Sequence, residues 1–287
     1  MEIMAAQHSG FCEGVERAYR IAVEQTESGK PVFMLGNLVH NTQVIEKFKK
    51  LGVRAVKSIS QIPDDAKGTL LISAHGVPPE IYEEAKAKGL RVVDTTCAWV
   101  KKAQRIAKEL AEEGRQVVII GDKDHPEVKG LIGWTQGQAK VIENISDISV
   151  ISGKKSGVLA QTTQSEEHFK NTVAEIKKQV KDVKEFNTIC GATSKRQNAA
   201  IELAKKVDLI LVIGDKMSAN TKRLTELCSK TGTETHQIQT VQELDQRWLA
   251  PRLRSGQDGK MERIGITAGA STPDWVVKEV VDRLNIC

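Results

Sequence analysis

The sequence of 287 residues is poor in aromatic side chains and contains no long apolar run, and both shortages limit what the protein can do. Aromatic residues make up 4% of the chain, and two of them are tyrosines. Because basic side chains are not interleaved with aromatic ones, we expect no nucleic-acid partner. The apolar run at 209–213 is far too short to span a bilayer, and the first residues lack an apolar signal core. The sequence therefore predicts a cytoplasmic protein with no membrane partner.

The chain has no Pro-rich or Ser-rich linker and no Gly-x-Gly-x-x-Gly fingerprint, and its number of cysteines is odd. Without the fingerprint for dinucleotide binding, electrons for any redox step are expected to come from outside the chain. Five cysteines in a cytoplasmic protein argue against a disulfide framework and favour metal or redox use of some thiols. The 42 basic and 37 acidic side chains are spread along the sequence, which suits a solvated surface, a small anionic substrate or an acidic protein partner.

What the chain does contain is a regular alternation of short apolar segments with helical ones. Such alternation predicts α/β lobes built on mostly parallel sheets. A loop is expected at 251–261, where Ser-Gly and Asp-Gly pairs occur. The expected strands are 31–36, 69–74, 91–95, 116–121, 140–143, 156–160, 186–189, 209–214, 234–239 and 263–267.

Three cysteines occupy equivalent places in an internal repeat. Cys97 follows a β-branched segment and precedes a helical one, and Cys12 and Cys190 have the same setting. The positive end of a helix dipole favours a thiolate, the form of cysteine that binds metal. From each of these cysteines it is 24 residues to a glycine that closes an apolar strand: Gly36, Gly121 and Gly214. Cys228 and Cys287 lie outside this pattern and are expected to be inert.

Other polar side chains recur in register with the three cysteines. Four residues beyond each glycine stand His40, His125 and Ser218. A later strand in each third ends near His75, Thr162 and Ser271. Any one of these positions could be purely structural. Because ligands bind beyond the carboxyl ends of parallel strands, the whole set predicts a functional site.

The repeat divides the chain into three lobes, residues 13–96, 97–189 and 190–287. The third lobe lacks a closing strand, and the opening segment before Cys12 is the expected donor, so residues 1–12 would complete it. This arrangement predicts a closed ring of three α/β lobes.

Two kinds of metal group are compatible with three thiolates. Zinc would take a fourth ligand, which one of the histidines could supply. A four-iron four-sulfur cluster would keep one iron open to substrate as a Lewis acid, and this gives the nearby polar residues a purpose. The residues alone leave both alternatives open.

Taken together in their order, eight short motifs resemble the 4-hydroxy-3-methylbut-2-enyl diphosphate reductase family along essentially the whole chain. The resemblance implies a trefoil of three pseudo-repeated α/β lobes around a central iron-sulfur cluster. The motifs are 10–15, 36–41, 73–77, 94–97, 125–128, 161–163, 189–193 and 267–271.

The resemblance also implies the chemistry. The family removes an allylic hydroxyl reductively, in the non-mevalonate isoprenoid pathway, to give isopentenyl and dimethylallyl diphosphate. It implies that Cys12, Cys97 and Cys190 hold one 4Fe-4S cluster with an open iron, and that an external ferredoxin or flavodoxin supplies electrons. Glu127 would be the acid, and Thr162 would relay its proton or orient the substrate hydroxyl.

For the diphosphate end of the allylic substrate the resemblance implies a set of fixed hydrogen-bond partners. One departure is visible, because the family often has a serine where this chain has Ala219, which offers only its backbone. The set is His40, His75, His125, Ser218, Ala219, Asn220 and Ser271, and Thr162 is the further substrate-binding residue, at the hydroxyl. Two alternatives are an iron-sulfur sensor or electron-transfer protein and a zinc hydrolase of a phosphorylated substrate. Neither would use all of these polar residues.

Overall fold

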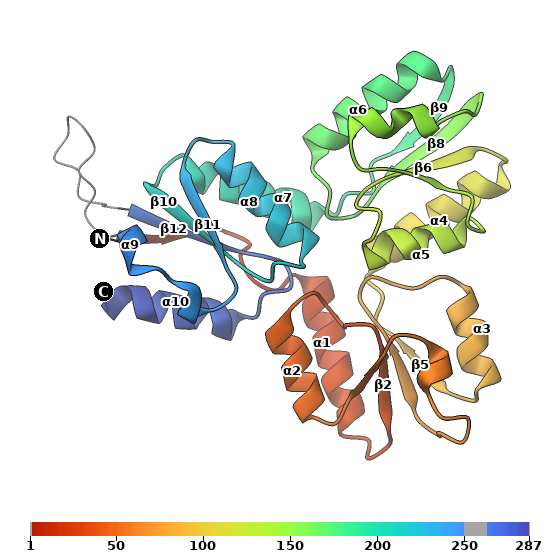
Figure 1. Ribbon diagram of the computed structural model, residues 1–287, viewed down its shortest axis with the longest axis horizontal. Coiled ribbons are helices and arrows are strands. Elements are labelled where there is room, and N and C mark those ends of the chain that lie inside the picture. The colour runs from red at the N-terminus through yellow and green to blue at the C-terminus, as the bar shows by residue number, and fades with distance from the viewer. Residues whose placement is uncertain (1, 250–262, 287) are drawn as a thin grey trace. The chain divides into compact units, whose positions relative to one another are not determined.

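The computed structural model describes residues 2–249 and 263–286, and Figure 1 shows its helices and strands. The predicted loop at 251–261 and Cys287 lie outside the described residues. The strands are β1 (Glu2–Ala5), β2 (Val32–Leu35), β3 (Arg54–Val56), β4 (Thr69–Ile72), β5 (Arg91–Asp94), β6 (Gln116–Ile120), β7 (Lys140–Ile142), β8 (Lys155–Ala160), β9 (Asp182–Phe186), β10 (Leu209–Ile213), β11 (Glu234–Ile238) and β12 (Arg263–Ala268). The α-helices are α1 (Glu13–Thr26), α2 (Thr42–Lys50), α3 (Glu80–Ala87), α4 (Ala98–Glu112), α5 (Pro126–Trp134), α6 (Glu166–Gln179), α7 (Gly191–Ala204), α8 (Ala219–Ser229), α9 (Gln246–Leu249) and α10 (Asp274–Ile286).

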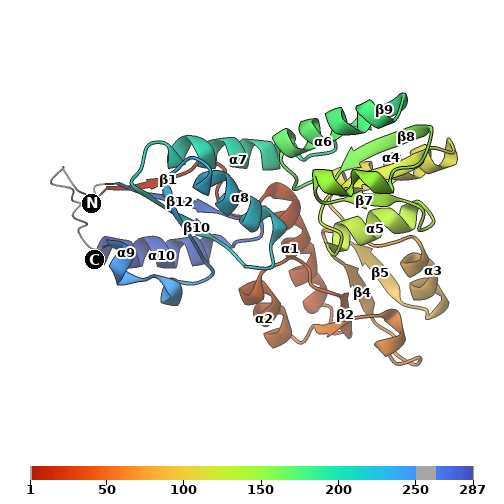
Figure 2. The same ribbon diagram turned by 45° about the horizontal axis from the view of Figure 1, so that its top comes forward.

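The strands form three parallel sheets with the same internal order (Figure 2). The orders are β3-β2-β4-β5, β7-β6-β8-β9 and β11-β10-β12-β1. In the third sheet the N-terminal strand takes the last place, with Glu2 beside Arg263 and Ala5 beside Ile266. This is where the sequence predicts the opening segment to lie. The fold class is therefore three α/β lobes, as expected.

Helices pack on both faces of the second sheet, because its central strands are apolar on both sides. In the second sheet Val117 and Ile119 pack with Leu131 of α5, while their neighbours Val118 and Ile120 face the α6 side. Alternating side chains of one strand point to opposite faces of a sheet, which explains the continuous apolar runs in the sequence. The sheets thus hold the carboxyl ends of their strands, where the polar residues follow, in fixed positions.

The described chain divides into two compact units, Glu13–Cys190 and a second one made of Met1–Cys12 with Gly191–Cys287. The first unit contains two of the sheets, and the second contains the third. The division of 13–189 into two lobes at residue 97 stays a prediction. None of the helices in the described part of the chain combines the length and apolar character needed to cross a membrane.

Two strand predictions were wrong, both at the edges of sheets. The strand expected at 186–189 is β9, which ends at Phe186 and is largely exposed. Its polar sequence hid it from a search for apolar segments. Strand β3 was missed altogether, because it has three residues and two of them are exposed. Edge strands need little apolar surface, so hydrophobic patterning identifies them poorly.

Candidate functional site

Each of the three repeat cysteines stands at the start of a helix, as predicted. Cys97 is the N-cap residue of α4, and Cys12 and Cys190 directly precede α1 and α7. All three are partly exposed thiols and not disulfides. By contrast, Cys228 is fully buried, and burial raises the pKa of its thiol to about 12. This difference separates three candidate ligands from one inert core cysteine.

A backbone hydrogen bond that the sequence did not predict recurs at all three cysteines. The amide of Cys97 donates to the carbonyl of Ala74 at 3.1 Å. Likewise, Cys190 donates to Thr162 at 3.0 Å, and Cys12 donates to Ala270 at 3.2 Å. The three acceptors follow β4, β8 and β12, the equivalent strands of the three sheets. Each cysteine is therefore tied to a strand end that carries a predicted polar site residue, and by the predicted boundaries Cys97 and Cys190 bond to the lobe that precedes them in the chain.

This local setting fits an iron-sulfur group. Thiolates are the usual protein ligands of such clusters. None of the three residues is fully buried, and the start of a helix offers a positive partial charge to an anionic ligand. The donor set is thus chemically suitable within each lobe.

Three histidines in the Glu13–Cys190 unit lie against one another. The ring centroids of His40 and His75 are 4.5 Å apart, and His125 lies 5.1 Å from His40 and 5.2 Å from His75. His40 follows β2, His75 follows β4, and His125 is the N-cap residue of α5. The structure therefore brings together three residues that the resemblance assigned to one ligand. We call His40, His75 and His125 the histidine trio.

Burial and mutual proximity keep at least two members of the trio neutral. Burial, assisted by His40, lowers the pKa of His125 to about 3. Burial also lowers the pKa of His75 well below 6.5, with further contributions from His40 and His125. Because Nδ1 of His125 accepts the Glu127 amide at 3.2 Å, a neutral His125 carries its proton on Nε2. The ring atoms also lie within 4.8 Å of one another, so the trio could accept either an anion or a metal ion.

Glu127 and Thr162 form a buried pair beside the trio. Glu127 is 2% exposed, and its Oε1 accepts the Thr162 amide at 2.7 Å while its Oε2 accepts the Thr162 hydroxyl at 2.8 Å. Burial raises the pKa of Glu127 to about 7 despite these two hydrogen bonds, and Asp122 adds to the rise. A carboxyl group with this pKa can hold or release a proton near neutral pH, which a general acid requires.

The remaining predicted residues lie in the other unit, beyond the ends of the paired strands β10 and β12. Ser218 is the N-cap residue of α8, and its hydroxyl accepts the Thr221 amide at 3.3 Å. Asn220 is 4% exposed, and neither polar atom of its side chain has a hydrogen-bond partner among the described residues. Ser271, 7% exposed, follows β12, and Ala219 begins α8. An unpartnered buried amide suits a polar ligand, since leaving it unpaired is costly.

Two supporting residues escaped the sequence analysis. Arg196 of α7 is 2% exposed, and its Nη2 donates to the Gly10 carbonyl at 2.6 Å, so it fixes the segment just before Cys12. Gly76 has a φ of +73°, and a Cβ there would lie 2.4 Å from Nε2 of Gln104, so the turn beside His75 requires glycine. The sequence signals that could have identified these two residues are a basic residue six positions after Cys190 and a glycine directly after His75.

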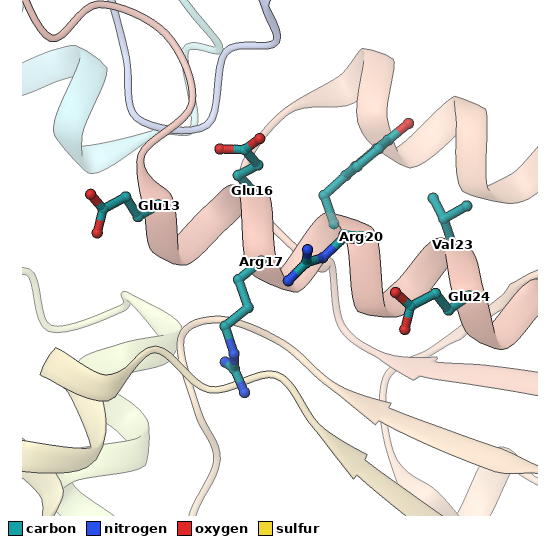
Figure 3. A pocket seen from close by; sticks show the side chains of 7 residues that line it. Glu13, Glu16, Arg17, Arg20, Val23 and Glu24 are labelled. Carbon is teal, nitrogen blue, oxygen red and sulfur yellow. The ribbon is translucent and has the colours of Figure 1, made fainter.

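A hollow also lies along helix α1. Figure 3 shows the labelled side chains of α1 around it, with both acidic and basic groups. It is lined by Glu13, Glu16, Arg17, Tyr19, Arg20, Val23 and Glu24. None of the predicted site residues lines it, so the candidate site is defined by the side-chain clusters instead.

The fold and the clusters define a class of protein: three α/β lobes of identical strand order, each with a cysteine bonded to a strand end at the start of a helix. The chain belongs to the LytB protein family, whose family model matches residues 3–285.

Curated relatives agree with this assignment. The 4-hydroxy-3-methylbut-2-enyl diphosphate reductase of Geobacter metallireducens is 42% identical over 99% of this chain and 97% of its own length. The protein of that name from Aquifex aeolicus is 41% identical over 100% of this chain and 97% of its own.

Solved structures share the fold. The E-1-hydroxy-2-methyl-but-2-enyl-4-diphosphate reductase from Plasmodium falciparum superimposes with a TM-score of 0.89, at 29% identity, over 99% of this chain and 87% of that one. A second structure, described as an (E)-4-hydroxy-3-methyl-but-2-enyl diphosphate reductase and as the terminal enzyme of the non-mevalonate pathway, matches with a TM-score of 0.69. It is 40% identical to this chain, and the match covers 100% of each of the two chains.

Proposed function

We propose that this chain is a 4-hydroxy-3-methylbut-2-enyl diphosphate reductase of the non-mevalonate isoprenoid pathway. The reaction replaces the allylic hydroxyl by hydrogen, so one substrate, two electrons and two protons give water and isopentenyl or dimethylallyl diphosphate. The full-length relatives support this assignment. The observation in this structure that carries it is the buried Glu127–Thr162 pair, whose carboxyl group can supply a proton at neutral pH.

Cys12, Cys97 and Cys190 would hold one 4Fe-4S cluster. Their shared setting at helix starts supports this role, and the family resemblance supplies the number of irons. When bound, such a cluster delivers electrons singly and offers an open iron as a Lewis acid. A ferredoxin or flavodoxin would supply those electrons.

The proton for the departing hydroxyl would come from Glu127. The Thr162 hydroxyl donates to Glu127 in this structure and could pass a proton onward or orient the substrate oxygen. The Thr162 carbonyl accepts the Cys190 amide, which connects the acid pair to a proposed cluster ligand. This connection is a reason to assign the acid role to Glu127 in preference to a merely structural one at the start of α5.

The histidine trio and the group Ser218, Ala219, Asn220 and Ser271 would bind the diphosphate. A neutral imidazole donates one N–H, so His75 and His125 can each offer one hydrogen bond to the anion. Asn220 supplies an unpartnered amide, and Ala219 would contribute its backbone N–H. Hydrogen bonds to charged ligands of this kind contribute about 1.5–3 kcal/mol each.

The first experiment is iron and sulfide analysis with Mössbauer spectroscopy on anaerobically purified protein, before and after adding the hydroxylated allylic diphosphate. We expect one iron in four to be distinct and its signal to shift when substrate is added. Stoichiometric zinc would favour a hydrolase instead. A cluster that does not respond to the diphosphate would favour a sensor or electron-transfer protein.

A further inference from the structure

Helix α4 carries its charges in the opposite order to the one that stabilises helices. Acidic residues near the first turn and basic residues near the last interact favourably with the helix dipole. Helix α6 follows this rule, with Glu166 and Glu167 first and Lys177 and Lys178 last. The first turn of α4 contains no acidic residue and its last turn no basic one. Helix stability therefore does not explain the charge order of α4.

The cations of α4 form an exposed stripe. They recur at helical spacing on the side opposite the buried Val100, Ala103 and Ala107. Trp99, 38% exposed, lies beside them, with Nζ of Lys102 5.4 Å from its ring centroid. We define the α4 cationic face as Trp99, Lys101, Lys102, Arg105 and Lys108.

Carboxylates only partly neutralise this face. Lys101 pairs with Asp94 at 2.7 Å. Arg105 and Lys108 pair with Glu109 and Glu112 over 3.8 and 3.7 Å. No carboxylate pairs with Lys102 among the residues that the structure describes. The face therefore keeps one net positive charge, four cations less three carboxylates, and it lies on Lys102 beside Trp99.

The α4 cationic face begins beside a proposed cluster ligand. Cys97 is the N-cap residue of α4, and the Lys101 amide donates to the Cys97 carbonyl at 2.9 Å. One helical turn, about 5.4 Å, therefore separates Cys97 from the first lysine of the face. Helix α1, which follows Cys12, begins with Glu13 and Glu16 instead. An anionic protein that docks on α4 would lie next to the Cys97 end of the helix.

We propose that the α4 cationic face is the docking surface for the electron donor, and that this donor is a small acidic ferredoxin. The proposal rests on the reductase function, because only then must electrons enter near Cys97. Each reduced ferredoxin would give one electron and leave oxidised, so two of them, with two protons, would serve each hydroxyl removed. Complementary charge raises the association rate, and Trp99, exposed beside Lys102, is of a residue type that is enriched at interfaces.

The test compares two donors on the complete, cluster-loaded enzyme. The variant is Lys102→Glu with Arg105→Glu, and the matched control is Lys177→Glu with Lys178→Glu, an equal change of charge on α6. Carboxylates near the start of α4 suit the helix dipole, so the test variant should fold. Stopped-flow absorbance would follow cluster reduction by reduced ferredoxin at several salt concentrations, and by reduced methyl viologen, a small cation that needs no docking surface.

We expect the ferredoxin rate at low salt to fall roughly tenfold or more in the test variant, with a weaker salt dependence. Methyl viologen should reduce both variants and the unaltered enzyme at rates within about twofold of one another. A ferredoxin rate that stays unchanged, or that falls equally in the α6 control, overturns the docking surface. Equal losses of rate with ferredoxin and with methyl viologen would also overturn the docking surface, because the cations would then affect reduction of the cluster itself and not the docking of ferredoxin. Failure of the unaltered enzyme to turn over with methyl viologen would instead overturn the proposed function.

Discussion

The histidine trio and the Glu127–Thr162 pair lie in the same compact unit, and burial acts on them in opposite directions. Burial lowers the pKa of His75 and His125, so these bases stay unprotonated at neutral pH. The same effect raises the pKa of Glu127 to about 7, so this carboxyl group is still protonated in about half of the molecules at pH 7. Removal from water disfavours the charged form of any group, whichever sign that charge has.

The difference teaches why both kinds of residue can serve one anionic substrate. A diphosphate bound by the trio meets N–H donors. The nearby Glu127 is protonated, and so uncharged, in about half of the molecules at pH 7. Two hydrogen bonds from Thr162 hold the carboxyl group in place without making it a strong acid. Binding and proton donation are thus assigned to separate residues, and each can be altered alone.

Changing Glu127→Gln should have the largest effect. Glutamine keeps the shape of the protonated acid and can still accept the Thr162 amide, but it has no proton to give. We expect kcat to fall by about 10²–10⁴-fold, the usual contribution of a general acid. Steady-state kinetics with reduced methyl viologen would measure this, with diphosphate binding by calorimetry as the companion measurement. An unchanged kcat would remove Glu127 from the chemistry.

The same variant should remove one component of the pH dependence of the free energy of unfolding. The pKa of Glu127 rises on folding from its usual 4.5 to about 7, so the native state binds the extra proton and loses stability as pH rises through this window. Glu127→Gln removes that loss, and should gain on the order of 3 kcal/mol relative to the unaltered chain between pH 4.5 and 8. His75 and His125 act oppositely, because their lowered pKa values cost stability as pH falls below 6.5.

Urea unfolding of the two cluster-loaded proteins at pH 5 and pH 8, with iron content checked at both, measures this difference. A gap between them that does not change with pH would contradict the raised pKa of Glu127.

Changing His75→Gln should weaken binding and leave the proton step largely intact. Loss of one hydrogen bond to a charged group costs about 1.5–3 kcal/mol, which corresponds to a rise in KM of roughly tenfold to a hundredfold. His236→Gln is the control, because His236 belongs to the other compact unit, where it bonds to Glu234 and stacks on Trp248. A lowered kcat with unchanged KM would show that His75 belongs with Glu127 and not with the binding residues.

The smallest effect is expected at the position where this chain departs from its family. Ala219→Ser would add one hydroxyl at the start of α8, next to the buried Asn220. One added hydrogen bond contributes about 1 kcal/mol, so kcat/KM should rise no more than about fivefold. Kinetics under identical conditions would measure it. If substantial activity appears only with serine, the backbone of Ala219 does not substitute for the family side chain.

The sequence predicted central strands and the starts of helices well, and edge strands poorly. Strands such as β6 and β10 are apolar on both faces, so their signal is continuous. Strand β9 is polar and exposed, and its prediction at 186–189 was displaced accordingly. The repeat at fixed spacing after strand ends predicted the cysteines and polar residues such as His40, His125 and Ser218, whereas Glu127 and Asn220 were implied only by the family resemblance. Arg196 was not, because a buried arginine looks like any other basic residue of a helix until its partner at Gly10 is known.

The sequence by itself determined the three-fold repeat of cysteine, strand and polar strand end, and with it the family. These features depend on local spacing, which a linear chain records directly. Only the tertiary structure decided that His40, His75 and His125 touch, that Glu127 is buried on Thr162, and that each repeat cysteine donates to a strand end. The contact between Glu127 and Thr162, for example, joins residues 35 positions apart. Their protonation follows from burial, which depends on everything packed around them.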